Sequence, residues 1–143
     1  MNRRSDSADL VIRLAARDAF AATLGIEAVD GGLGRAAVRM RVRPEHLNFN
    51  GTCHGGVVFS LADTAFGLAS NSHGAIAAGV DAHITYQVAV HVGEVLTATA
   101  IEVSRGRKLA VYRVDVENEA GSLVSSFTGT VYVTTKSNES GEL

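Results

Sequence analysis

One segment constrains the fold more than any other. Between about Gly55 and Asn71, the run GGVVFSLADTAFGLASN places apolar residues around most of a helix. Such a helix is expected to be buried on all sides. The segments after it have the patterns of strands: 75–90, 93–104, 109–117 and 122–134. In the third, apolar residues alternate with charged ones, as in a half-buried strand. The sequence therefore predicts an α+β fold in which an antiparallel sheet wraps around a long central helix.

The segment before the central helix predicts a further helix and a further strand. Three residues are suited to cap that N-terminal helix: Asp6, Ser7 or Asp9. We expect it to run without a break to Gly25, where glycine favours a helix end. Residues 31–32 are two glycines and predict a turn, after which 38–42 alternate Val and Met with Arg before Pro44. A sheet of five or six strands covers only part of the central helix, so a second subunit is expected to cover the rest.

The 143 residues are enough for one domain with a substantial core. We expect a single domain over 10–134, with disorder in 1–9 and in the tail 135–143. The first nine residues are polar and lack the apolar core of a signal peptide.

Composition excludes several classes of partner. The formal net charge of −2 gives no electrostatic footprint for nucleic acid or for an anionic membrane. Apolar stretches are too short to span a bilayer. The single cysteine, Cys53, cannot form an intrachain disulfide, so a cytoplasmic location is expected. The five histidines show no metal-ligand spacing, and no metal site is predicted. Cys53 adjoins His54, but no acid completes a triad, so a cysteine nucleophile is not expected.

Asp63 is the strongest candidate for a functional residue. It is the only formally charged residue between His46 and Val80 and lies within the apolar helix pattern. A buried carboxylate is costly and needs a partner or a function. Upstream, His54 and two glycines open the same helix. A lone acid and bare backbone N–H groups on one helix together indicate an active site.

At this point the residues resemble a known family. The stretch 48–56 reads NFNGTCHGG, 59–66 reads FSLADTAF, and Asn71 is followed by Ser72. This pattern is similar to that of the hotdog-fold acyl-CoA thioesterases, most closely their phenylacetic-acid-degradation (PaaI) branch. The resemblance implies hydrolysis of an acyl-CoA, with aryl-acetyl esters such as phenylacetyl-CoA favoured, in phenylacetate catabolism. It also implies a homotetramer built as a dimer of dimers, and no cofactor besides the CoA of the substrate.

The resemblance assigns a role to each matching position. Asp63 would be the general base or the nucleophile, and the Gly55 N–H would bind the oxyanion. Asn48 would bind the thioester carbonyl or position water, and His54 would face the thioester. Each also has a purely structural interpretation. Asp63 could bond to the backbone or to Thr64, Gly55 and Asn48 could serve as turn residues, and His54 could be a helix cap.

Two further sets of residues follow from the resemblance. Family members often carry a hydroxyl residue near the start of the second strand, but the matching position here is Gly79. Thr85 or Asp81 would take the role of that hydroxyl residue only if the strand aligned in a different register. The second set is the basic hairpin turn of Arg105, Arg107 and Lys108, which is suited to the CoA phosphates, although an exposed basic turn is more often merely solvated.

Helix geometry gives an independent prediction. His54 and Asp63 are nine residues apart, which places them on opposite faces and about 13 Å apart along the axis. One helix cannot supply both groups to one substrate. A two-fold dimer brings the helix start of one subunit to the acid of the other, so we expect two composite sites per dimer.

Two other functions are compatible with a hotdog fold. A non-catalytic acyl-CoA-binding module usually carries an added DNA-binding unit and has no use for an acid at Asp63. An enoyl-CoA hydratase or dehydratase needs an acid–histidine pair with a proline-bearing loop. The only proline, Pro44, precedes the motif. Thioester hydrolysis is therefore the favoured expectation.

Overall fold

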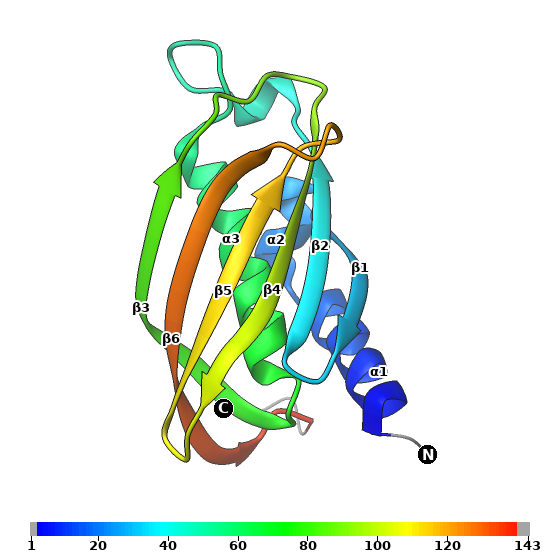
Figure 1. Ribbon diagram of the computed structural model, residues 1–143. Helices are drawn as coiled ribbons and strands as arrows, with labels where there is room; N and C mark the ends of the chain where they lie inside the picture. Colours follow the sequence, from blue (N-terminus) through cyan, green and yellow to red (C-terminus); the bar gives the residue numbers. More distant parts are fainter. Residues whose placement is uncertain (1–2, 140–143) are drawn as a thin grey trace.

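Figure 1 shows a six-stranded antiparallel sheet curved around one helix. This computed structural model describes residues 3–139. Its α-helices are α1 (Arg3–Ala16), α2 (Ala19–Leu24) and α3 (Gly55–Asn71), with a 3-10 helix over Pro44–His46. Its strands are β1 (Glu27–Gly32), β2 (Arg35–Arg41), β3 (Ala75–Tyr86), β4 (Val95–Arg105), β5 (Leu109–Glu117) and β6 (Leu123–Ser137). The strand order is β1-β2-β4-β5-β6-β3, which makes β1 and β3 the edges.

The helix α3 packs on the concave side of the sheet, as predicted. Leu61 and the small residues Ala62, Ala65 and Ala69 are fully buried at this contact. Beside them the Phe66 ring lies 5.4 Å from the ring of Phe127, centroid to centroid. Small side chains at the contact let the helix approach the strands closely. No helix within residues 3–139 is long and apolar enough to cross a membrane.

The predicted turn at the two glycines is wrong, because both belong to the edge strand β1, which sequence patterning missed. The turn lies one step later, at residues 33–34. A Cβ added at Gly31 would lie 2.7 Å from Cβ of Val11. Gly31 is therefore a site of close contact between α1 and β1. The predicted strand 109–117 coincides with β5.

The N-terminal helix is broken where continuity was predicted. Helix α1 ends at Ala16, and the Asp18 side chain caps α2 by accepting the Ala21 N–H at 3.0 Å. An aspartate at this position competes with the helical backbone and favours a new start. The predicted end at Gly25 is correct, and Gly25 adopts φ 73°.

Both predicted disordered ends contain ordered residues. Helix α1 begins at Arg3, so residues 3–9 are helical, and the three predicted caps (Asp6, Ser7 and Asp9) lie inside it. At the other end β6 continues to Ser137, and the buried Asn138 side chain donates to the Asn71 carbonyl at 2.8 Å. Residues 1–2 and 140–143 lie outside the described residues.

Candidate active site

The helix α3 is not buried on all sides in the described chain. Gly56, Ser60, Asp63 and Gly67 recur at helical spacing along its face away from the sheet, where they are exposed or only partly buried. This uncovered face is the part of the helix that a second subunit is expected to cover. Asp63 therefore lies on the face of the helix that the sheet does not cover, a stripe of residues along α3.

Asp63 lines a pocket of about 740 Å³ between this stripe and the N-terminal helices. Its apolar walls include Leu14, Phe20, Phe59 and Leu68. Polar groups also line it: Arg17, Asp18, Ser60, Asp63, Thr64 and Asn71. A pocket with apolar walls and a few polar groups suits an acyl substrate beside a reactive carboxylate.

The Asp63 carboxylate has no hydrogen bond or ion pair to any residue between 3 and 139. A purely structural Asp63 could form a hydrogen bond to Thr64, but the Thr64 hydroxyl donates to the Ser60 carbonyl at 2.7 Å. Partial burial in the pocket raises the pKa of Asp63, and the Asp18 charge raises it further. A carboxylate without a partner and with raised proton affinity is suited to proton transfer.

The start of α3 presents an unused backbone donor. His54 precedes the helix, and its Nδ1 accepts the Gly56 N–H at 2.8 Å, which is the cap interpretation of this residue. No acceptor in the described chain takes the Gly55 N–H. A Cβ added at Gly55 would lie at an ordinary 3.4 Å from the Tyr86 ring, so internal packing does not require glycine there. Glycine at this position leaves the backbone open to a ligand.

Asn48 organises its own loop. Its Oδ1 accepts the N–H groups of Asn50 at 2.9 Å and Thr52 at 3.2 Å, and its Nδ2 donates to the Thr52 hydroxyl at 3.2 Å. These contacts match the turn interpretation of Asn48. They also fix the loop 48–52 next to the start of α3.

Gly55 and Asp63 do not meet within one protomer. Helix α3 is continuous between them, and eight residues separate them by about 12 Å along the axis. A single carbonyl group cannot contact both groups at that distance. One α3 therefore does not bring the two groups together, and a site shared between two subunits stays a prediction.

The structure places the hydroxyl candidates on the outer face of β3. Thr85 pairs with Ser126, and Asp81 pairs with Thr130, on the face opposite to that of the buried Phe127. Neither substitutes for Gly79, which faces Phe66. Sequence reasoning missed Tyr86, whose hydroxyl donates to the Gly55 carbonyl at 3.1 Å. Because side chains alternate between the two faces of a strand, Tyr86 lies on the same face as Ile84, and this was the sequence signal that could have identified it.

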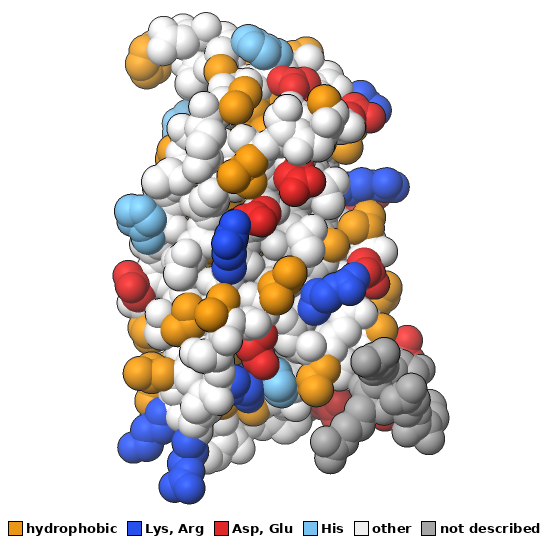
Figure 2. Space-filling view, viewed as in Figure 1, with side chains coloured by type: hydrophobic (Ala, Val, Ile, Leu, Met, Phe, Trp, Pro, Cys, Tyr) orange, Lys and Arg blue, Asp and Glu red, His pale blue; other side chains and the backbone are white. Residues whose placement is uncertain are grey.

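The basic hairpin lies beside the end of α3 that is opposite to Gly55 (Figure 1). Arg107 and Lys108 are exposed, and Figure 2 shows basic side chains projecting at that end. Arg105 differs because its Nη1 is buried without a hydrogen-bond partner in the described chain. Its charge acts on Glu102, so Arg105 belongs partly to the interior and is a weaker candidate for CoA than its neighbours.

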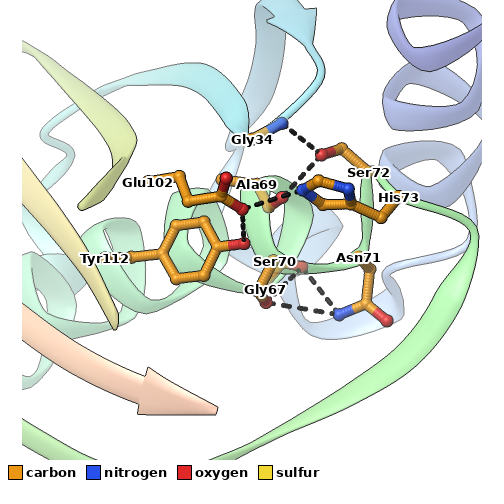
Figure 3. A network of polar contacts seen from close by, with 9 residues as sticks. All are labelled: Gly34, Gly67, Ala69, Ser70, Asn71, Ser72, His73, Glu102 and Tyr112. Atoms are coloured by element: carbon orange, nitrogen blue, oxygen red, sulfur yellow. Dashed lines mark hydrogen bonds and ion pairs between the residues drawn. The ribbon is translucent and has the colours of Figure 1, made fainter. Parts of the chain in front are cut away.

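Glu102 is the centre of a separate polar network (Figure 3). Its Oε1 accepts the Tyr112 hydroxyl at 2.5 Å and lies 2.8 Å from His73 Nε2. Burial acts to raise the pKa of Glu102, but the hydrogen bonds from Tyr112 and His73 and the nearby positive charges outweigh it and lower that pKa. This network joins β4 and β5 to the turn after α3. It is a structural cluster away from Asp63.

Two other chemistries find no support in the described residues. Burial and the charge of Glu94 raise the pKa of the Cys53 thiol to about 11, so this thiol is protonated at neutral pH. No group of three or more metal-binding side chains is formed within residues 3–139.

Known proteins resemble this chain in sequence and in structure. A family model described as the thioesterase superfamily matches residues 50–125. A putative esterase of Archaeoglobus fulgidus is 52% identical over 69% of this chain, but the match spans only 64% of that protein. The acyl-coenzyme A thioesterase PaaI of Escherichia coli is 39% identical over 78% of this chain and 80% of its own length.

Comparison with solved structures gives the same family as comparison of sequences. The Escherichia coli PaaI structure covers 95% of this chain and 99% of its own, with a TM-score of 0.92 and 32% identity in the structural alignment. A Streptococcus mutans protein bound to acetyl-CoA has a TM-score of 0.76 and 32% identity, over 78% of this chain and 90% of its own. The chain therefore belongs to the thioesterase superfamily and is a thioester hydrolase with the hotdog fold.

Proposed function

We propose that this protein hydrolyses acyl-CoA thioesters, with aryl-acetyl-CoA esters such as phenylacetyl-CoA or its hydroxylated derivatives as the preferred class. The products are the free acid and CoA, and the role is in aromatic (phenylacetate) catabolism. The observation that carries the proposal is the Asp63 carboxylate, which has no partner in the described chain and lines a pocket with both apolar and polar walls. The similarity to PaaI supports the aryl-acetyl class.

The reaction uses two groups of the chain. Asp63 takes a proton from water as the water oxygen bonds to the thioester carbon. In the alternative route Asp63 attacks that carbon itself, the thiolate leaves, and water then hydrolyses the mixed anhydride to the free acid and the Asp63 carboxylate. The Gly55 N–H donates to the carbonyl oxygen as negative charge develops there. The carbon–sulfur bond then breaks, and the thiolate of CoA takes up a proton. Asn48 and His54 are assigned to the thioester carbonyl and the leaving sulfur, and no cofactor is required.

The active form is a homodimer with composite sites. Its Gly55 and Asp63 come from different subunits, since one α3 cannot bring them together. The open edge of β3 supports this pairing, because its twelve residues include neither proline nor lysine to protect the edge. Phe49 is 97% exposed on the loop beside Asn48 and would be covered by a partner.

A second interface would make the homotetramer, a dimer of dimers. The outer face of β4 and β6 supports it, with Ile101, Val103 and Tyr132 exposed there. Arg107 and Lys108 are assigned to the CoA phosphates. A reducing cytoplasm is the proposed location, with Cys53 buried and free.

The test is the initial rate of thiol release from a panel of CoA esters: phenylacetyl, 3,4-dihydroxyphenylacetyl, benzoyl, acetyl and hexanoyl. We expect rapid release from the aryl-acetyl esters and a loss of about two to four orders of magnitude in Asp63→Asn. Equal rates across the panel would remove the aryl-acetyl assignment. No release from any ester, with CoA esters still bound in calorimetry, would favour a binding module. Hydration of an enoyl-CoA would favour a hydratase.

A further inference from the structure

The break between α1 and α2 lies on the wall of the pocket that Asp63 also lines. Arg17 and Asp18 form this break, and both line the pocket. A continuous helix would present different side chains to the pocket at this point. One Asp18 oxygen accepts the Ala21 N–H at 3.0 Å, which fixes the carboxylate in place.

We propose that Asp18 is a positioning residue for the hydrolysis, acting on Asp63 through the negative charge that the cap of α2 fixes across the pocket. This inference rests on the proposed function, since it concerns how Asp63 works in that reaction. Asp18 itself need not touch the substrate.

The charges around Asp63 support this assignment. Arg17 and Asp18 are the only charged residues of the described N-terminal segment that line the pocket, and α3 carries no charged residue besides Asp63. Arg17 donates from Nη2 to the Asn138 carbonyl at 3.1 Å, which engages its guanidinium away from Asp63. After burial, the Asp18 charge is the cause that raises the pKa of Asp63. A negative charge across a partly desolvated pocket makes a second ionised carboxylate less favourable and a better proton acceptor.

The cap alone does not explain an acid at this position. Asparagine and serine cap helices about as well as aspartate, and neither carries a charge. The charge and the cap can therefore be separated by substitution. Asp18→Asn and Asp18→Ser remove the charge and keep a capping side chain, whereas Asp18→Ala removes both.

The experiment compares pH profiles of kcat/KM and kcat for the wild type and these variants, on the CoA ester hydrolysed fastest. We expect the acidic limb to move to lower pH in both capping variants, because Asp63 then ionises more readily. The plateau kcat should fall by about two- to tenfold, with KM little changed. Glu119→Gln is the matched control, since it removes an exposed carboxylate from the β5–β6 turn and should leave the limb in place.

Each outcome decides the proposal. An unmoved acidic limb in both capping variants, with thermal unfolding like that of the wild type, overturns it. Failure of both capping variants to fold also overturns it, because the charge would then serve the fold. A wild type that hydrolyses no CoA ester refutes the proposed function instead. A movement of the limb in Glu119→Gln as large as in Asp18→Asn would show a net-charge effect and overturn the specific role of Asp18.

Discussion

Gly55 and Asp63 can each be inactivated with little disturbance of α3. Asp63→Asn keeps the side-chain shape and removes the charge. Gly55→Pro removes the backbone N–H, and proline is well tolerated at the first position of a helix. His54 has φ −61° and ψ 134°, a conformation that a following proline favours. Each variant alone should lose about two to four orders of magnitude in kcat.

Mixing the two variants separates a composite site from a site within one protomer. Random exchange of equal amounts makes about half of the dimers mixed. In a mixed dimer with composite sites, one site joins the intact Gly55 of one subunit to the intact Asp63 of the other, and the second site carries both defects. The mixture should therefore recover about a quarter of the wild-type rate. A site contained in one protomer gives no recovery, because every protomer carries one defect.

The assay is thiol release after the two variants, carrying different tags, are unfolded together and refolded. Affinity capture through one tag and then the other isolates the oligomers that contain both variants, which should recover at least about a quarter of the wild-type rate. A mixture of wild type and Asp63→Asn treated in the same way controls for losses in refolding. Purified oligomers of both variants that are no more active than either variant alone would refute the cross-subunit argument.

Three further predictions follow from the geometry of the site. The pKa of the Asp63 carboxyl is higher in the folded than in the unfolded chain, so ionisation of Asp63 lowers the stability of the fold as pH rises through this pKa. In calorimetry, Asp63→Asn should therefore unfold at a higher temperature than the wild type at neutral pH. In strong acid, where Asp63 is protonated, the two should unfold alike. Tyr86→Phe keeps the ring against Gly55 but removes the hydroxyl donor, and should lower kcat less than about tenfold with KM unchanged. Arg107→Ala with Lys108→Ala should raise KM for CoA esters, most at low salt, but not for a thioester of N-acetylcysteamine, which lacks the nucleotide.

Elements with their own periodic pattern could be predicted from the sequence. The apolar run fixed α3 at 55–71, and strict alternation fixed β5 at 109–117. Gly25 ended its helix as expected because its left-handed conformation favours glycine. In each case local chemistry and the final packing agree.

Elements that depend on a neighbour could not be predicted. None of the six residues of β1 is buried and two of them are glycines, and the strand forms by pairing with β2. The break at Asp18 was missed because aspartate fits both a surface helix position and a cap. The Asp63 motif was found, but its pocket was not, since Leu14 and Phe20 reach it from a segment remote in sequence.

The proposed division of the site between two subunits agrees with what one helix can offer. The start of α3 provides free N–H groups and a positive dipole end, where an oxyanion is best stabilised. The stabilisation of negative charge by the helix start falls off within the first turn, so a base two turns further along the helix does not disturb the binding of the oxyanion. If Asp63 lay in the first turn, the same N–H groups would stabilise its charge and lower its pKa, which would weaken it as a base. In the proposed dimer, two antiparallel copies of α3 would bring a stabilising helix start and a basic carboxylate to one carbonyl and keep them about 12 Å apart within each chain.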